Sequence, residues 1–452
     1  MPFEVSRTPK SANAAAPAAE RRPSGFSHLV LHLHPRMVPA EALRFSRTLG
    51  LGGASVVLFV LLAATGTLLL MTYEPSPERA YGAVTAVVEE AHFGAFIRNA
   101  HHWAANALVL VTFLHLLRVF YRGGHLASRR GNWLVGLALL CLVVASAFTG
   151  YLLPWDQLAY WAVTISTGML QYVPLLGGAM VLAARGGAEV GPATLARFFV
   201  LHVAILPITL LLLLAFHFWL VRKTGGVVLP ADVGDAAAPR GPLLPVSPAL
   251  TRREGVAALV VTAAVLLLAA VADAPLLAQA NPGMSPNPAK APWYFMGIQE
   301  ALVHLHPLFA AVVLPVAALA LLAALPFFGG KADGTGRWFG STRGARTALG
   351  AAIAGALLST AAIAVDERLR RSPPWLPKLL PAIRGGLLPM LAGAAVVAAV
   401  ALLARQRGAS RTEAIQAAFT FVVVAFAIFT VTGIVFRGPG MALAWPHALE
   451  AP

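Results

Sequence analysis

Residues 101–120 read HHWAANALVLVTFLHLLRVF, and residues 198–223 read FFVLHVAILPITLLLLLAFHFWLVRK. Each stretch is apolar except for a few positions, which include three histidines in the first (His101, His102 and His115) and two in the second (His202 and His217). The two pairs of interest are His101 with His115 and His202 with His217. A separation of 14 residues, as in the first pair, is about four turns and about 21 Å of an α-helix; the second pair is 15 apart. Each pair therefore lies near one face of its helix, with one histidine toward each end.

The composition places the chain in a membrane. Of its 452 residues, 58% are hydrophobic and 12% are charged, whereas soluble domains average about a quarter charged residues. The net charge of +15 does not indicate nucleic-acid binding, because the basic residues cluster in the tail and in loops beside apolar segments. The single cysteine, Cys141, lies in an apolar run, so an internal disulfide and a CxxC or CxxCH motif are excluded.

Nine apolar segments are candidates to cross a bilayer, which takes about 20 residues. They are 49–73, 103–117 (extendable to 99–121), 133–153, 198–221, 256–271, 307–328, 348–365, 387–404 and 414–436. The predicted fold class is therefore an all-α polytopic membrane protein with about nine transmembrane helices. The stretch 156–190 is too polar and too interrupted to span, so we expect short helices along the outer surface there. The Pro-rich stretch 280–291 is expected to be an outer loop.

Loop charges predict the orientation. The tail up to Arg47 carries seven basic and three acidic residues, and the loop after the second span carries four arginines and no acid. The loop after the first span instead carries four glutamates and two arginines. The positive-inside rule then places the N-terminus in the cytoplasm. We expect a multi-pass protein of a bacterial cytoplasmic membrane.

Histidines inside a membrane are costly and are functional candidates by default. A single one is commonly satisfied by a hydrogen bond to a neighbouring helix, but two pairs at matched spacing favour axial ligation of haem iron. Both helices run from outside to inside, so we predict one b-type haem held by His101 and His202 on the outer side. A second would be held by His115 and His217 on the inner side. Pro207 is expected to kink its helix and so realign the pair that is 15 residues apart.

Glycines and arginines at related positions support this prediction. Two glycine pairs, each 14 residues apart, would let a flat macrocycle approach a helix backbone, although small residues also serve ordinary helix packing in membranes. The glycines are Gly52 and Gly66 in the first span and Gly136 and Gly150 in the third. Haem propionates are anionic and favour arginine. Arg98 and Arg197 lie near the outer pair and Arg118 near the inner pair, where they are alternatively interfacial positive charges.

Several strings resemble the cytochrome b subunit of the quinol-oxidising cytochrome bc and b–f (Rieske–cytochrome b) complexes. These are LGLGG, HHWAANALVLVTFLHLLRVF, GYLLPWDQLAYWAV, TLARFFVLHVAILP, FHFWLVRK and ANPGMSPNPAKAPWYF. The resemblance covers roughly residues 45–365, as a fused N- and C-terminal-domain chain. It implies quinol oxidation in an outer pocket, electron transfer across the membrane through two haems to an inner quinone site, and coupled proton translocation. It also implies a Rieske iron–sulfur protein, a c-type cytochrome and a homodimeric complex as partners.

The resemblance also implies roles for individual residues. The outer quinol pocket would be lined by Pro154, Trp155, Asp156, Gln157, Trp293 and Tyr294. The family's PEWY motif reads Ala291-Pro292-Trp293-Tyr294 here, so its glutamate is replaced by Pro292. We expect Glu300 or Asp156 to accept the quinol proton instead, although either is alternatively a structural acid. Gly50 stands where chloroplast-type relatives carry a cysteine, so no covalent haem is expected.

The predicted organisation has five parts. These are a disordered or surface tail (1–44), a dihaem four-helix bundle (45–226), a linker (227–253), a C-terminal cytochrome b domain (254–366) and two additional helices (367–452). Two other functions share some of these features. A dihaem membrane anchor of another quinone-linked dehydrogenase or hydrogenase has paired histidines but no reason to carry both the PWDQ and the PWYF strings. A transporter without a cofactor needs no matched histidine spacing.

Overall fold

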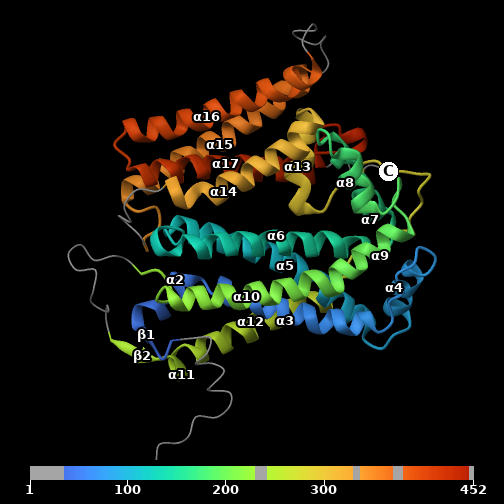
Figure 1. Cartoon of the computed structure of the whole chain (residues 1–452), viewed down its shortest axis with the longest axis horizontal. Coiled ribbons are helices and arrows are strands. Elements are labelled where there is room, and N and C mark those ends of the chain that lie inside the picture. The colour runs from blue at the N-terminus through green and yellow to red at the C-terminus, as the bar shows by residue number, and fades with distance from the viewer. Residues whose placement is uncertain (1–34, 230–241, 329–335, 370–379, 447–452) are drawn as a thin grey trace, which may run out of the picture.

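The computed structural model describes residues 35–229, 242–328, 336–369 and 380–446. Within these ranges nine helical spans are long and apolar enough to cross a membrane, which confirms the predicted all-α polytopic class. They are α3 (Leu51–Leu70), α5 (Gly94–Tyr121), α6 (Arg130–Leu152), α9–α10 (Pro192–Lys223), α12 (Thr251–Val271), α14 with its preceding turn (Leu308–Phe328), α15 (Thr342–Leu369), α16 with its preceding turn (Ile383–Gln406) and α17 (Arg411–Val435). Figure 1 shows these helices lying side by side.

The sequence of α3 shows why such segments are helical. Its 20 residues carry no charged side chain, and only Leu58 and Thr65 are buried against the rest of the chain. The remaining side chains are partly or fully exposed, which leaves apolar surface for lipid. A backbone without water must satisfy its own polar groups, and a helix does so within the segment.

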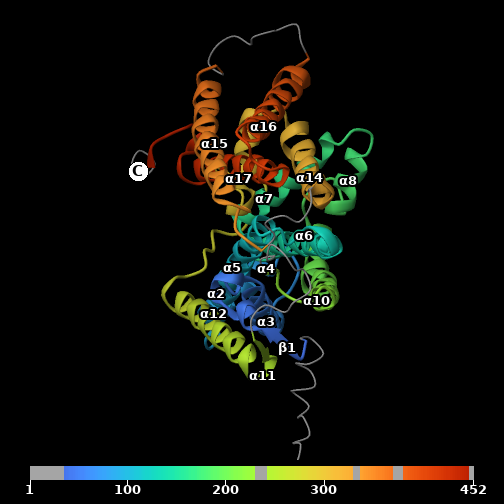
Figure 2. The same ribbon diagram turned by 90° about the vertical axis from the view of Figure 1, so that its left-hand side faces the viewer.

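The spans form two groups. In the first, α3 packs against α5 and α6 packs against α10, while α12 lies against both α3 and α5. The second comprises α14, α15, α16 and α17, with α17 in contact with both α15 and α16. Figure 2 shows the second group on one side of α5 and α6. The expected four-helix bundle is thus α3, α5, α6 and α10.

Short helices gather at the end of the spans that is predicted to be the outer one (Figure 1). Helices α7 (Gln157–Gly168) and α8 (Gly177–Arg185), joined through a 3-10 turn at Met169–Tyr172, occupy the stretch predicted to lie along the surface. Residues 275–292 are mainly non-helical, as expected of the Pro-rich loop. Helix α4 (Ala80–Glu89) is an additional short helix that the sequence analysis did not anticipate.

The predicted tail and linker meet at the opposite end. Strand β1 (Met37–Pro39) pairs antiparallel with β2 (Leu243–Pro245), which leads into α11 (Val246–Ala249). The end of the predicted tail and the end of the predicted linker therefore pack on each other. Apolar burial explains the pairing, because Val38 and Val246 join one small core cluster. Residues 1–34 of the predicted tail lie outside the described residues.

Candidate functional site

The four histidines meet in two pairs between α5 and α10. The ring centroids of His101 and His202 are 6.3 Å apart, with the ring planes at 74°. His115 and His217 are likewise close enough to interact electrostatically. The pairing expected from helix direction is therefore the pairing found, and each pair brings two imidazoles from different helices toward one space.

Hydrogen bonds fix which ring nitrogen the outer pair presents. The Nδ1 atom of His202 lies 2.9 Å from the backbone carbonyl of Ser146, which can only accept a hydrogen bond, so Nδ1 donates. The Nδ1 atom of His101 lies 2.9 Å from Oγ1 of Thr65, and that hydroxyl already donates to the carbonyl of Leu61 at 2.8 Å. Nδ1 of His101 is therefore also the donor. Both rings keep the Nε2 lone pair that a metal ligand requires.

The inner pair has a different hydrogen-bond environment. The Nδ1 atoms of His115 and His217 are buried and have no hydrogen-bond partner within the described parts of the chain. A buried polar atom without a partner is costly and calls for a functional explanation. Two such atoms on facing histidines are consistent with rings that turn to bring a nitrogen toward a shared ligand.

Each histidine lies against one of the four predicted glycines. A β-carbon at Gly66 would lie 3.1 Å from Cε1 of His101, and one at Gly150 would lie 2.4 Å from Cε1 of His202. The same holds at the inner end, where Gly52 faces His115 at 3.3 Å and Gly136 faces His217 at 3.5 Å. Each of the four glycines therefore lies beside one of the four histidine rings.

A π-helical turn before α10 brings His202 and His217 onto one face despite their 15-residue spacing. Residues Leu201–Ile205 form this turn, and the N–H of Leu206 bonds to the carbonyl of Leu201, five residues back. Pro207 has no N–H to give to the carbonyl of Val203, which allows the wider turn to form directly before it. The turn accommodates one extra residue, so realignment comes from a π-bulge rather than from the simple proline kink that we expected.

These residues fit haem. Two imidazoles are too few to hold a bare metal ion, and no cluster of three His, Cys, Asp or Glu side chains occurs among the described residues. A group that brings four ligands of its own needs only the two axial nitrogens that each pair offers. The glycines leave the backbone open beside each ring.

The three predicted propionate partners are engaged with backbone carbonyls. Arg98 donates to the carbonyls of Ala274 and Pro275 at 2.8 and 2.7 Å. Nε of Arg118 donates to the carbonyl of Arg47 at 2.9 Å, and Arg197 donates to Leu182 and Ala183. A guanidinium has five N–H donors, so these bonds leave further donors for an anion.

The PWDQ string fastens the α6–α7 junction to the loop that follows α12. Both carboxylate oxygens of Asp156 accept backbone N–H groups, Oδ1 from Ala159 at 2.8 Å and Oδ2 from Leu277 at 3.1 Å. The side chain of Gln157 bonds to the backbones of Asn281 and Met284. The polar atoms of Asp156 and Gln157 thus hold two walls of the predicted pocket together. Pro154 stands in the turn between the two helices.

The aromatic residues of the predicted pocket fall into two neighbouring clusters. Trp155 is 5% exposed and belongs to a cluster at the outer end, whereas Trp293 and Tyr294 pack on a cluster between the spans. Phe148 joins the two, since it packs on the first cluster and its ring lies 5.7 Å from that of Phe295. Nε1 of Trp293 donates to Asn106 on α5 at 2.8 Å. Burial raises the pKa of Tyr294, which keeps its phenol protonated as a hydrogen-bond donor.

Glu300 lies in a buried charge network. It is fully buried in α13 (Met296–His304), and its two oxygens receive Nη2 and Nε of Arg437 at 2.7 and 2.9 Å. Burial alone would raise the pKa of Glu300, but hydrogen bonds from His304 and Arg437 and the charge of the arginine hold it below its usual range. Nε2 of His304 lies 2.9 Å from Glu300, and its Nδ1 lies 2.6 Å from Asp366.

Sequence reasoning missed Arg437. It follows α17, is 1% exposed and also donates to Glu367 at 3.0 Å. The string FRGPG suggests only the end of a span, so an arginine there reads as an interfacial charge. The acids it pairs with lie far away in the sequence and give no local signal.

Comparisons with known proteins agree with this geometry. The family model described as Cytochrome b/b6/petB matches residues 39–225. The cytochrome b6 of Heliobacterium mobile is 40% identical over 206 residues, which is 46% of this chain and 96% of that protein. The cytochrome b6 of Prochlorococcus marinus is 41% identical over 175 residues, 39% of this chain and 80% of that protein.

The remaining part of the chain is matched by fold. A chain of a solved structure titled "Hyperthermophilic respiratory Complex III" superposes with a TM-score of 0.64 at 23% identity, covering 88% of this chain and 93% of that one. At this identity the match shows a shared fold. With the cytochrome b6 relatives covered almost end to end, the resemblance expected from the sequence strings is confirmed. This chain belongs to the cytochrome b/b6 family.

Proposed function

We propose that this chain is the dihaem cytochrome b subunit of a quinol-oxidising, proton-translocating complex in a bacterial cytoplasmic membrane. The observation that carries the proposal is the set of two opposed histidine pairs, each ring flanked by its own glycine. His101 with His202 and His115 with His217 are the proposed axial ligands of an outer and an inner b-type haem. Haem supplies reversible one-electron chemistry at iron when bound.

The protein's contribution at the two sites is orientation. Thr65 and Ser146 hold the outer rings with Nε2 toward the shared space. Gly52, Gly66, Gly136 and Gly150 leave room beside the rings, and Arg98, Arg118 and Arg197 supply donors for propionates. Mostly apolar helices surround both sites and exclude water, which strengthens electrostatic interactions inside.

Quinol is proposed to bind at the outer end, beside Trp293 and Tyr294. The protonated phenol of Tyr294 is a donor for a quinone oxygen, and its ring and that of Trp293 supply the apolar wall. Pro154 and Trp155 contribute the opposite wall, which Asp156 and Gln157 position through their bonds to the loop. Asp156 is therefore proposed first as a residue that positions the pocket wall, and only second as a proton acceptor.

Glu300 remains the proposed proton acceptor, and its neighbours suggest an exit. A carboxylate with a lowered pKa does not store a proton but passes it on. His304 connects Glu300, which is fully buried, with Asp366, whose side chain is 36% exposed. The proposed route therefore runs from Glu300 through His304 to Asp366 at the outer surface. Further partners under this proposal are a Rieske iron–sulfur protein, a c-type cytochrome and a second copy of the complex.

A reduced-minus-oxidised spectrum of the purified protein, with pyridine haemochrome quantification, tests the proposal. Two non-covalent b-type haems per chain are expected, with selective loss of one in His101→Ala and of the other in His115→Ala. A protein with no haem would overturn the dihaem assignment and favour a transporter. Dihaem content without quinol oxidation by the assembled complex would instead favour the membrane anchor of another enzyme.

A further inference from the structure

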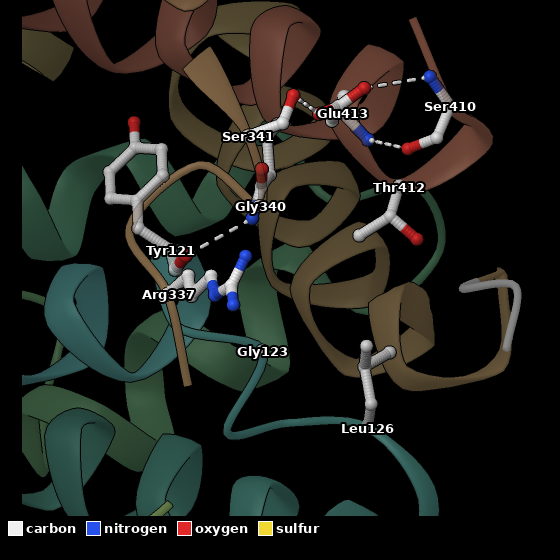
Figure 3. A pocket seen from close by; sticks show the side chains of 10 residues that line it. Tyr121, Gly123, Leu126, Arg337, Gly340, Ser341, Ser410, Thr412 and Glu413 are labelled. Atoms are coloured by element: carbon white, nitrogen blue, oxygen red, sulfur yellow. Dashed lines mark hydrogen bonds between the residues drawn. The ribbon is translucent and has the colours of Figure 1, made fainter. Parts of the chain in front are cut away.

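A cavity of about 230 Å³ lies at the inner end of the second helix group, away from all four histidines. Three segments line it: the end of α5 and its following loop, the loop before α15, and the first turns of α17 (Figure 3). Its lining includes the polar or charged residues Tyr121, Arg337, Ser341, Glu413 and Gln416. Its position at the ends of three spans places it at the level of a membrane surface.

The floor of this cavity carries a hydrogen-bond acceptor without a partner. Gln416 is 3% exposed, and its Nε2 donates to the backbone carbonyl of Tyr121 at 3.2 Å. Because that carbonyl can only accept a hydrogen bond, the nitrogen of the Gln416 amide must point toward it. The amide oxygen Oε1 therefore points the other way. Oε1 has no hydrogen-bond partner within the described residues. An unpaired buried acceptor on a residue that lines a cavity calls for a donor from a ligand.

A buried carboxylate lies beside it. Glu413 is 7% exposed and accepts from the hydroxyl of Ser341 and from the backbone N–H of Ser410 at 2.8 Å (Figure 3). These donors are neutral, so they leave the negative charge of the carboxylate in place. The floor of the cavity is therefore suited to a cationic group with N–H donors.

The rim has the opposite charge. Arg337 is exposed at the cavity and Arg343, close enough to interact electrostatically with Glu413, stands on the first turn of α15. Next to Arg337, Trp338 is 40% exposed and its ring centroid lies 6.2 Å from that of Tyr121. Half-exposed tryptophan is typical of the interface between lipid and water.

We propose that this cavity binds the head group of phosphatidylethanolamine from the inner leaflet. The ammonium group donates to Oε1 of Gln416 and faces the carboxylate of Glu413, and the phosphate meets Arg337. The ligand thus bridges the α5–α6 loop, the segment before α15 and the start of α17. It adds to the contact between the two helix groups at this end, where Phe120 and Tyr121 of α5 already pack on Phe419 of α17. This inference does not depend on the proposed electron-transfer function.

Short-chain lipids provide the test. The purified full chain in detergent is titrated with dihexanoyl phosphatidylethanolamine and, separately, with the matching phosphatidylcholine, which has the same phosphate but no donor on its head group. We expect the ethanolamine lipid to bind about tenfold more tightly, the effect of one charge-assisted hydrogen bond. Equal affinity for the two lipids would overturn the proposal. So would equal binding of dihexanoyl phosphatidylglycerol, which has donors without a positive charge.

Variants assign the binding to this cavity. Gln416→Leu removes the acceptor on the floor, and Arg337→Gln removes the positive charge on the exposed rim without disturbing buried packing. Gln416→Leu is expected to abolish the preference for ethanolamine. Arg337→Gln removes the charge that faces the phosphate of both lipids, so it is expected to weaken the binding of both about tenfold, whereas Arg346→Gln, at an exposed position of α15 outside the cavity, leaves affinity and preference unchanged. An unchanged preference in Gln416→Leu, or an unchanged affinity in Arg337→Gln, would contradict the site. Free phosphoethanolamine binding as tightly as the lipid would contradict a membrane source.

Discussion

Gly150 on α6 lies against the ring of His202, which stands in the π-helical turn before α10. An added β-carbon at this glycine would lie 2.4 Å from Cε1 and 2.8 Å from Nδ1 of the histidine, closer than real side-chain contacts. The ring is held there by its hydrogen bond to Ser146, one turn earlier on α6. Gly150 and the carbonyl of Ser146 together determine where the imidazole of His202 points.

Gly150→Ala should therefore displace His202 and remove the outer haem. Neither α6 backbone nor the hydrogen-bonded ring can yield easily, so about half of the haem content should be lost while the inner haem stays. Gly131→Ala, near the inner end of the same helix, is the control because nothing lies within 4 Å of its β-carbon. Pyridine haemochrome quantification of both variants checks this. Full haem content in Gly150→Ala would show that the ring does not need the observed position.

Thr65→Val should weaken the outer site without distorting it. Valine has the shape of threonine but cannot accept the Nδ1–H of His101, and loss of such an outer hydrogen bond typically costs 10–100-fold in metal affinity. Thr67→Val on the same helix is the matched control, because Thr67 is exposed and bonds only to its own helix. A redox titration should show a shifted midpoint potential for one haem in Thr65→Val alone. A shift in both haems, or in neither, would argue against this hydrogen bond as the cause.

The fold was predictable because its signals are local. A run of about 20 apolar residues such as α3 is recognisable in the sequence, and so are histidines spaced by whole helical turns. The position of the glycines beside the histidines was predictable for the same reason, since spacing on one helix carries the information. The sequence does not reveal which distant residue a polar group will pair with. The bond between Glu300 and Arg437 spans 137 positions, and the pairing of Met37–Pro39 with Leu243–Pro245 gives no periodic signal.

Glu300 and Arg437 should stabilise the contact of α13 with α17 only when both residues are present. Removing one partner of a buried pair leaves an uncompensated charge and typically costs about 3–5 kcal/mol. Arg437→Gln should therefore lower the thermal unfolding temperature markedly. The double variant Glu300→Gln with Arg437→Gln should recover much of the loss, since two neutral amides can bond to each other. If the double variant were less stable than Arg437→Gln, the coupling between the two residues would be absent.

His304→Gln tests the proposed proton route while keeping the ion pair. Glutamine preserves a hydrogen bond to Glu300 but cannot take up and release a proton between Glu300 and Asp366. Quinol oxidation by the assembled complex should slow roughly tenfold or more, the range of proton-transfer contributions, and show an enlarged solvent deuterium isotope effect. The haem spectra should be unchanged. His306→Gln, two residues away and outside this network, is the control; equal rates in the two variants would dismiss the route.

His125 should make the protein sensitive to mild acid. It lies in the loop between α5 and α6, is 2% exposed and packs between the rings of Phe120 and Trp133, and its Nδ1 has no partner among the described residues. Burial lowers the pKa of His125 from 6.5 to about 4. The unfolded chain therefore binds a proton at a pH where the folded chain does not, so stability is full above pH 6.5 and falls between about 6.5 and 4.

The size of this loss follows from the shift. At about 1.4 kcal/mol for each pKa unit, full protonation costs on the order of 3 kcal/mol. His125→Phe keeps the aromatic packing and removes the proton site, so its unfolding temperature should fall less than that of the wild type between pH 7.5 and 5. Thermal unfolding in detergent is measured for both proteins at both pH values. The drop in unfolding temperature of the variant is then subtracted from that of the wild type, which removes the contribution of every titrating group that the two proteins share. Parallel pH dependence of the two proteins would mean that the buried ring contributes nothing to acid sensitivity.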